Sequence, residues 1–394
     1  MINILSHELL NRDIKLTEKD FKNNLNIISS EIKGSSVLII GAAGSIGSAV
    51  VKKIVDFHPK NLYLIDNNEN GLVDLIRFIR SSDKEIKTEI KILSSSVDSE
   101  IFKLYLDTHK PFDTILNFAA RKHVRTEEDV FSSLLLFKTN LLDTHELLNF
   151  IQENNISKKY FAVSTDKAAD PFNLMGATKR LMEACIFQSE IDSYSTRFAN
   201  VAFSKGSLLA SFPKRIENNQ PIPVPNKIKR FLITEEEAAE ICLISCFCTP
   251  KNSVLIPKTG ILEEIELKTV LENYLHTLNL KPLYFDNKDD AINYFSSSSH
   301  SKDLYPVVLT DPNTTGEKVS EKFLASDEEV EAVFENFDII LSKKRFEPDI
   351  EKFSAELYEI FNKDLTKEKL VNLSLKFLPT MSHVETNLSL NNQI

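Results

Sequence analysis

Long apolar runs are missing from this chain. A helix that crosses a membrane needs about 20 consecutive, mostly apolar residues, and no run among the 394 residues approaches that length. The first residues, MINILSHELLNRDIK, also lack the basic and then apolar order of a secretory signal. We therefore expect a soluble, cytoplasmic protein that does not act at a membrane.

Cysteine is scarce as well. The four cysteines are Cys185, Cys242, Cys246 and Cys248, and the last three lie in one apolar segment, ICLISCFC. Their spacing does not match that of a zinc site, so we predict no metal. We expect them to be small buried residues on a helix, a use of thiols that suits a reducing compartment.

An excess of positive charge is also absent. The 47 Lys and Arg residues are outnumbered by 57 Asp and Glu residues, which gives a net charge of −10. Because nucleic-acid binding needs clustered Lys and Arg to contact phosphates, we expect no nucleic-acid partner. One basic pocket for a sugar nucleotide remains compatible with this balance. The hydrophobic content of 42% is enough for one large core or two smaller ones.

What the chain does have, from Ser35 onward, is a regular alternation of short apolar runs and helical patterns. A strand that is buried on both faces reads as a continuous apolar run. We predict such strands at residues 37–40, 62–65, 90–93, 114–117, 160–163 and 194–197. Their alternation with helices predicts an α/β fold with a doubly wound parallel sheet of the Rossmann type.

The pattern divides the chain into four predicted regions. Residues 1–33 are polar and lysine-rich, with apolar residues at helical spacing, which predicts a helical arm on the main body or on a partner subunit. Residues 34–202 form the predicted Rossmann domain. Residues 203–325 form most of a smaller, interleaved substrate-binding part with returns to the sheet. Residues 326–394 are expected to form a helical segment and a tail.

Beyond Phe203 the pattern is less regular. The Pro-rich segment 216–230 predicts loops and short strands, and segment 233–248 predicts a helix. The Ser-rich, charged segment 287–303 is typical of a surface insertion. The residues from about 378 carry few signals of a core, so we expect either a docked or a mobile tail.

A glycine-rich turn joins the first predicted strand to a helix. In Gly41-Ala-Ala-Gly44-Ser-Ile-Gly47 the glycines permit a tight turn, close approach of the backbone to a pyrophosphate, and close packing of the helix. The N-terminus of that helix favours phosphate through its N–H groups and its dipole. Asp66 ends the next strand, where a carboxylate bonds the ribose of NAD and repels the extra phosphate of NADP. We therefore predict NAD as cofactor; the alternative is a purely structural turn.

Several motifs resemble, in order, those of one protein family. The glycines have the GxxGxxG spacing of extended short-chain dehydrogenases/reductases. Residues 164–184, STDKAADPFNLMGATKRLMEA, resemble the signature of the CapD-like polysaccharide-biosynthesis proteins, which include nucleotide-sugar 4,6-dehydratases. The segments 117–124, 196–216, 229–238 and 314–318 resemble further motifs of this family, so the resemblance covers roughly residues 8–330.

This resemblance implies the removal of water across C5–C6 of a hexose. Oxidation of C4 to a ketone acidifies the C5 proton; a base then takes it, an acid protonates the departing C6 hydroxyl, and the hydride returns to C6. By resemblance Lys167 is the base and Asp166 the acid. A lysine is a base only if burial or positive charge lowers its pKa, and Lys122 and Lys179 could supply that charge. The alternative is an Asp–Lys pair on the surface.

One position departs from the YxxxK pattern of short-chain dehydrogenases. Lys179 matches the lysine, which by resemblance bonds the nicotinamide ribose, but Met175 stands at the tyrosine position one helical turn earlier. Methionine cannot accept the proton of the C4 hydroxyl. Either another group accepts it, such as Asp166 or a water held by Thr165, or the site is degenerate. The intact Asp166, Lys167 and Lys179 favour activity.

The resemblance also assigns binding residues around this centre. The expected cofactor contacts are Gly41, Gly44, Ser45, Ile46, Gly47, Asp66, Asp98, Ala119 and Lys179. The expected substrate contacts are Lys122, His123, Asn200, Arg230 and Glu317. Arg230 and Asn200 are expected at the nucleotide diphosphate, since a guanidinium binds phosphate bidentately. Glu317 is expected near the nucleoside ribose, although Thr315 stands where the family has an arginine. A surface arginine at 230 and a solvated loop at 122–123 are the alternatives.

Together these features predict an NAD-dependent 4,6-dehydratase of a nucleotide sugar. The expected substrate is UDP-N-acetylglucosamine, and the expected product is a 4-keto-6-deoxy sugar nucleotide for surface-glycan synthesis. Two rival functions remain: an epimerase on the same fold, and a protein that binds nucleotide without turnover, which Met175 supports. We expect a homo-oligomer, because extended members of this superfamily commonly pair through helices of the Rossmann domain.

Overall fold

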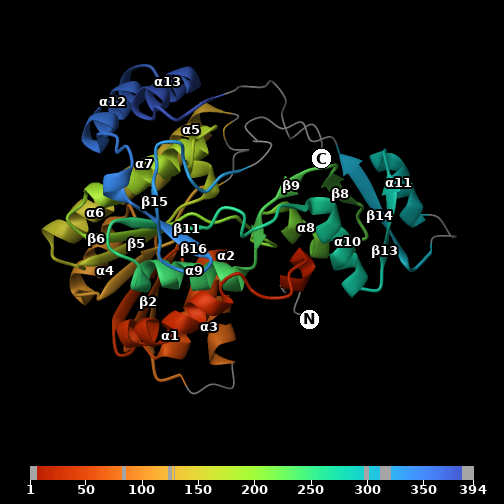
Figure 1. Cartoon of the computed structure of the whole chain (residues 1–394), viewed down its shortest axis with the longest axis horizontal. Helices are drawn as coiled ribbons and strands as arrows, with labels where there is room; N and C mark the ends of the chain where they lie inside the picture. Colours follow the sequence, from red (N-terminus) through yellow and green to blue (C-terminus); the bar gives the residue numbers. More distant parts are fainter. Residues whose placement is uncertain are drawn as a thin grey trace.

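A nine-stranded sheet forms the centre of the larger part of the molecule (Figure 1). The computed structural model describes residues 7–81, 86–122, 127, 129–296, 301–310 and 321–383. Within them the strand order is β15-β16-β11-β6-β5-β4-β1-β2-β3. The strands from β3 to β11 are parallel, and β16 and β15 continue the sheet antiparallel at one edge. The predicted doubly wound α/β fold is confirmed.

The strands of this sheet lie where the apolar runs predict them. They are β1 (Ser36–Ile40), β2 (Asn61–Asp66), β3 (Glu89–Ser94), β4 (Thr114–Asn117), β5 (Lys159–Val163), β6 (Asp192–Thr196), β11 (Ser253–Pro257), β15 (Val330–Ala332) and β16 (Phe337–Leu341). The first six coincide with the six predicted strands to within two residues at each end. In β1 the residues from Val37 to Ile40 are at most 1% exposed, because helices cover both faces of the sheet.

Helices pack in two groups on opposite sides of the sheet (Figure 1). One group contains α1 (Glu18–Ile32), α2 (Ser45–Ile54), α3 (Glu69–Arg80) and α9 (Glu235–Cys248). The other contains α5 (Val130–Phe137), α6 (Asp143–Glu153), α7 (Leu174–Gln188), α12 (Ile350–Lys363) and α13 (Lys367–Phe377), while α4 (Glu100–His109) joins β3 to β4. No helix in the described part of the chain is long and apolar enough to cross a membrane.

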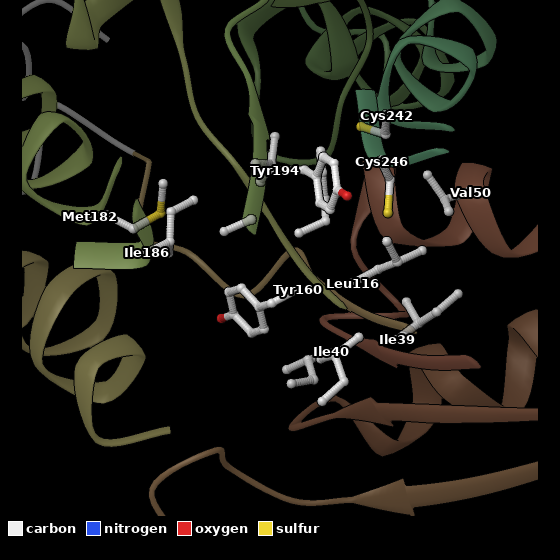
Figure 2. Close-up of a cluster of buried hydrophobic side chains, with 14 of the residues drawn as sticks. Ile39, Ile40, Val50, Leu116, Tyr160, Met182, Ile186, Tyr194, Cys242 and Cys246 are labelled. Atoms are coloured by element: carbon white, nitrogen blue, oxygen red, sulfur yellow. The ribbon is translucent and has the colours of Figure 1, made fainter. Parts of the chain in front are cut away.

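The cysteines are buried in this packing as predicted. Figure 2 shows Cys242 and Cys246 of α9 directed into the apolar cluster that also contains Val50 of α2. Cys185 is buried as well, and Cys248 is half-buried. Burial raises the pKa of all four thiols, so they are small apolar residues rather than reactive groups.

A smaller core lies beside the large sheet. It is built on a parallel three-stranded sheet of β8 (Ile222–Pro225), β13 (Lys281–Phe285) and β14 (Leu304–Thr310), with α8 (Leu208–Glu217), α10 (Leu267–Thr277) and α11 (Lys288–Ser296). Two short pairs of strands lie outside these two sheets. They are the parallel pair of β7 (Asn200–Val201) with β10 (Leu232–Ile233) and the antiparallel pair of β9 (Lys229–Arg230) with β12 (Ile265–Glu266).

One sequence prediction at this end of the chain is wrong. Segment 287–303 is not simply a surface insertion, because α11 packs against β13 and β14 and its Ala291 is fully buried. The described residues after 377 are docked on the core, one of the two forms expected for the tail, since Leu378 is 1% and Met381 7% exposed. In both segments a few apolar side chains among polar neighbours find a partner only through tertiary contacts.

The N-terminal arm, residues 7–32, contacts both cores. Its helix α1 packs on α9, and Leu16 belongs to the larger core. Leu10 lies in the smaller core, and the side-chain amide of Asn273 on α10 donates to the carbonyl of Leu9. Between these two contacts, Arg12 forms an ion pair of 2.7 Å with Glu237 on α9. The arm is thus helical over Glu18–Ile32 and packs on the main body, one of the two positions expected from the sequence.

Candidate active site

The glycine turn is packed too tightly for any larger residue at two positions. Gly41 has a φ of +74°, and a Cβ there would lie 2.7 Å from the backbone nitrogen of Ala119. A Cβ on Gly47 would lie 2.1 Å from the carbonyl oxygen of Gly41. Gly44 has an ordinary φ of −68° and is the N-cap of α2. The turn therefore places the start of α2, with Ser45 and Ile46, at the carboxyl edge of the sheet beside Ala119.

Asp66 lies against the same turn. One carboxylate oxygen accepts a hydrogen bond from the backbone of Ala43 and the other from the backbone of Asn68, both at 2.9 Å. These bonds fix a half-buried carboxylate at the end of β2, next to the glycine turn. The predicted ribose-binding residue and the predicted phosphate-binding turn thus form one continuous surface.

Asp98 is near this surface but already has partners. It is exposed, on the loop after β3, where the neighbouring backbone of Ser95 donates to the carbonyl of Asp66. Its carboxylate accepts hydrogen bonds from Ser96 and, at 2.5 Å, from Lys138. The bond from Lys138 lowers the pKa of Asp98, so the group is a carboxylate at neutral pH.

Thr165, Asp166 and Lys167 form a compact turn directly after β5. Thr165 donates to Asp166 Oδ1 at 2.7 Å, and Lys167 Nζ donates to the same oxygen at 3.0 Å. Asp166 is 1% exposed, and its Oδ2 has no hydrogen-bond partner among the described residues. An orphaned acceptor of this kind is costly unless a ligand supplies a donor. Asp166 is thus buried and Lys167 is 19% exposed, which differs from the fully exposed Asp–Lys pair considered as an alternative.

The surroundings of Lys167 raise its pKa, whereas a lysine that acts as a base needs a lowered pKa. Burial lowers the pKa of Lys167, but the carboxylates of Asp166 and Glu321 outweigh this effect and the pKa is raised. The opposing positive charge is that of Arg230, rather than those of Lys122 and Lys179 as expected. In the ligand-free protein Lys167 is therefore an ammonium ion, and the lowered pKa considered from the sequence is not found.

The N-terminus of α7 lies against this turn. A Cβ on Gly176 would lie 2.3 Å from the carbonyl oxygen of Lys167. The carboxylate of Glu127 accepts from the backbone of Met175 at 2.8 Å and of Leu174 at 3.1 Å, and burial raises its pKa. Met175 is 3% exposed and offers no proton acceptor. The place of the usual tyrosine is thus filled by an apolar side chain beside a buried carboxylate.

Lys179 follows one turn later on α7, also buried. Its Nζ donates to the carbonyl oxygen of Val163, the last residue of β5, at 2.9 Å. Burial lowers the pKa of Lys179 to about 8. Lys179 therefore binds the end of β5, the strand that is followed by Thr165, Asp166 and Lys167.

The predicted substrate residues are partly brought together. Arg230 on β9 is half-buried, and its charge acts on Lys167. Asn200 is half-buried on β7, and the Nζ of Lys122 lies 3.5 Å from the hydroxyl of Ser204. His123 and Glu317 lie outside the described residues. Arg230 is therefore a partly exposed residue whose charge acts on Lys167.

Two residues near the site were missed from the sequence. Lys205, from the loop after β7, donates its backbone N–H to the hydroxyl of Ser45 and its Nζ to the carbonyl of Ala43, both at 2.8 Å. Glu321 lies 3.5 Å from Lys167 Nζ. Both residues fall within or next to quoted motifs, but nothing in their spacing shows which charges they meet.

A buried cluster of charges contacts Ser164, the residue that precedes the turn of Thr165, Asp166 and Lys167. Its members are Arg180, Glu183, Arg197, Glu328 and Arg345, none more than 9% exposed. Glu183 accepts from Arg197 at 2.6 and 2.8 Å and from Arg345 at 2.5 Å. It also accepts at 2.5 Å from Ser164, the residue before Thr165. The cluster therefore joins α7, the end of β6 and the segment from residue 321 to 347.

Comparison with known proteins agrees with this architecture. The family model described as "Polysaccharide biosynthesis protein" matches residues 37–340, somewhat offset from the range expected from the motifs. The capsular polysaccharide biosynthesis protein CapD of Staphylococcus aureus is 25% identical over 333 residues, covering 81% of this chain and 54% of CapD. The chain thus spans about half the length of that relative.

Other similar proteins act on nucleotide sugars. A UDP-N-acetylglucosamine 4,6-dehydratase (inverting) of Campylobacter jejuni is 28% identical over 57% of this chain and 67% of its own length. The structure of a UDP-N-acetylglucosamine 4-epimerase from Methanobrevibacter ruminantium, 18% identical, matches 86% of this chain and 99% of its own with a TM-score of 0.51. A dTDP-glucose 4,6-dehydratase from Bacillus anthracis in complex with NAD, 14% identical, matches 74% and 88% with a TM-score of 0.52.

The two structures show the fold, and the family match shows the ancestry. The match covers the glycine turn, the catalytic turn and the segment that carries Glu321 and Glu328. It confirms the resemblance inferred from the motifs. With relatives that include a 4,6-dehydratase of a nucleotide sugar, this chain belongs to the family of polysaccharide biosynthesis proteins.

Proposed function

We propose that the protein is an NAD-dependent 4,6-dehydratase of a nucleotide sugar, with UDP-N-acetylglucosamine as substrate, in surface-polysaccharide synthesis. The observation that carries the proposal is the ion pair of the buried Asp166 with Lys167 at the carboxyl end of β5, on the same edge of the sheet as the glycine turn. An acid and a base in contact are what an elimination needs and a simple oxidation does not. The similarity to the Campylobacter dehydratase supports the substrate.

The glycine turn fits a dinucleotide. The N-terminus of α2 would bind the pyrophosphate through Ser45 and Ile46, and Asp66 would accept from the ribose hydroxyls, a contact that favours NAD over NADP. Asp98 and Ala119 would complete the adenosine side, and Lys179 would bond the nicotinamide ribose. The structural relative with NAD supports this choice. NAD supplies the acceptor for the hydride of C4 and its return to C6.

Lys167 and Asp166 would carry the two proton steps. Their hydrogen bond of 3.0 Å lets the ammonium proton pass to Asp166, which leaves a neutral amine and a neutral carboxylic acid. Exclusion of water favours this uncharged form, because burial penalises separated charges. Lys167 would then take the C5 proton, and Asp166 would give its proton to the C6 hydroxyl, which leaves as water. After the hydride returns to C6, Lys167 would give a proton back to C5. The proton released earlier from the C4 hydroxyl would then return to the pair, which restores the ammonium and the carboxylate.

The acceptor of the C4 hydroxyl proton is not Met175. Asp166 and a water held by Thr165 are the candidates, and both lie on the catalytic turn. The substrate diphosphate would contact Arg230 and Asn200, and the sugar would contact Lys122 and His123. We further propose that residues 203–325, including the smaller core, form the substrate-binding part, with Glu317 near the nucleoside ribose, and that the protein is a cytoplasmic homo-oligomer.

Two glycine variants test the cofactor site. Gly44→Ala is expected to cost less stability than Gly47→Ala, since its Cβ would lie 3.3 Å from the Gly41 carbonyl oxygen, which would have to shift only slightly. It is expected to weaken NAD binding by obstructing the pyrophosphate. Gly47→Ala is expected to destabilise the fold by about 1–3 kcal/mol, because its Cβ would lie 2.1 Å from a carbonyl oxygen. Denaturant unfolding and calorimetric titration with NAD measure the two effects. Unchanged NAD affinity in Gly44→Ala would contradict this placement of the cofactor.

The proposed reaction is tested by the mass of the product. Purified protein mixed with UDP-N-acetylglucosamine and NAD is expected to yield a nucleotide sugar lighter by one water. Consumption of a different nucleotide sugar, with UDP-N-acetylglucosamine unchanged, would overturn the substrate assignment.

The same measurement separates two rivals. The fold similarity to a 4-epimerase favours an epimerase, which would change stereochemistry at unchanged mass. The apolar Met175 at the tyrosine position favours a protein that binds nucleotide without turnover. Tight NAD binding with no product from several nucleotide sugars would establish that second rival.

A further inference from the structure

A second carboxylate reaches Lys167 from a distant part of the chain. Glu321 is 7% exposed, and its Oε1 lies 3.5 Å from Lys167 Nζ. Asp166 Oδ1 lies 3.0 Å from the same nitrogen. One ammonium ion thus contacts two buried carboxylates, and the guanidinium of Arg230 is the neighbouring positive charge.

The segment that carries Glu321 is held in place by buried charges. The carbonyl of Phe323 accepts from Arg197 Nη1 at 3.0 Å, and the backbone of Ala325 donates to Glu328 at 2.8 Å. The backbone of Ser326 donates at 2.9 Å to Asp170, three residues after Lys167. These bonds tie the segment both to the charge cluster and to the catalytic turn, so the position of Glu321 beside Lys167 is fixed.

The charge balance around Lys167 depends on this second carboxylate. With Asp166 alone, the two groups could share one proton and become a neutral pair when water is excluded. With Glu321 present, the side chains of Lys167, Asp166 and Glu321 carry one net negative charge, whether Lys167 or Asp166 holds the shared proton. This negative charge stabilises the ammonium form of Lys167.

We propose that Glu321 is a positioning residue that fixes the ammonium group of Lys167 and holds its proton until substrate binds. The role of Lys167 as a base rests on the proposed function, whereas the contact with Glu321 does not. Glu321 thereby sets the pH above which Lys167 is a free amine.

The proposal is tested with Glu321→Gln, which keeps the shape of the side chain and removes its charge. The rate at which an acylating reagent modifies Lys167 is measured as a function of pH by peptide mass spectrometry. The midpoint, the pH at which the labelling rate of Lys167 is half of its maximum, is expected to fall by about one pH unit or more. An opposite charge at this distance shifts a pKa by that amount. Lys251, which is exposed and pairs with Asp192, is the internal reference, and its curve is expected to stay the same.

Two further measurements keep the test decisive. Glu321→Asp retains the charge and is expected to restore most of the midpoint, which loss of packing alone would not explain. In the unmodified protein the midpoint of Lys167 is expected above the ordinary lysine value of about 10.4, a measurement that needs no variant to fold.

A midpoint for Lys167 that does not move in Glu321→Gln, or that moves together with Lys251, would overturn the proposal. So would a midpoint below the ordinary value in the unmodified protein. Labelling requires neither cofactor nor turnover, so a failure of the dehydratase assignment would appear separately, as a shifted midpoint without product. If the dehydratase assignment holds, the acid limb of the kcat/KM profile is expected to move to lower pH in Glu321→Gln.

Discussion

Replacing Lys167 with methionine is expected to abolish dehydration while NAD still binds. Methionine has nearly the length of lysine but cannot exchange a proton, and loss of a positioned acid or base costs about 10²–10⁴-fold in rate. The change also leaves Asp166, which is 1% exposed, without its ion-pair partner. The measurement is kcat/KM from the mass of the product, together with calorimetric titration of NAD.

The matched control for that variant is Lys251→Met. Lys251 forms an exposed ion pair with Asp192, the first residue of β6, outside the site. Turnover is therefore expected to stay within about twofold of the unmodified protein. Turnover by Lys167→Met at the rate of this control would show that Lys167 takes no part in proton transfer. Loss of both turnover and NAD binding would instead indicate that the variant has disturbed the fold.

Replacing Arg197 with methionine is expected to lower the free energy of unfolding by about 3–5 kcal/mol, the usual cost of breaking a buried ion pair from one side. Arg197 is 0% exposed and donates to both Glu183 and Glu328. Without it, two carboxylates with almost no access to water lose their principal donor. Denaturant unfolding followed by circular dichroism measures the change. Lys251→Met, in an exposed pair, is expected to cost at most about 1 kcal/mol.

The same cluster predicts the direction of the pH dependence. Burial would raise the pKa of Glu183, but Arg197 and Arg345 outweigh it and lower that pKa to about 2. A carboxylate with a lower pKa in the folded state stabilises the fold above its unfolded value, about 4.3, and this contribution is lost as the pH falls toward 2. The unmodified protein is therefore expected to lose stability over this range more steeply than Arg197→Met. Parallel curves for the two proteins would contradict the assignment.

The elements that could be predicted from sequence are those that depend on residues close together in the chain. The strands of the Rossmann domain are continuous apolar runs because both faces are buried, and the Gly41–Gly47 turn needs glycine for steric reasons that the structure reproduces. The turn of Thr165, Asp166 and Lys167 could be singled out because segment 164–184 resembles a family signature. The pairing of Asp166 with Lys167 follows from their adjacency in the chain.

The features that sequence could not predict depend on contacts between distant segments. Glu321 meets Lys167 across more than 150 residues of chain, and the raised pKa of that lysine follows from the meeting. Helix α11 was mistaken for a surface insertion because one buried residue, Ala291, is a weak signal among Ser, Asp and Asn. Lys205 lies on the loop after β7 and contacts Ser45 beside the glycine turn. The spacing of apolar residues in the sequence does not indicate this contact.

The N-terminal arm is a noncovalent cross-link between the two cores. Because Leu10 is embedded in the smaller core and Arg12 is paired with Glu237 of α9, a hinge rotation that moved the cores apart would have to extract one or break the other. Glu237 also accepts from the backbone of Leu16 and closes the first turn of its own helix, so the anchor point is itself rigid. Ligand exchange is therefore expected to proceed through movement of individual loops, with the two halves of the molecule remaining together.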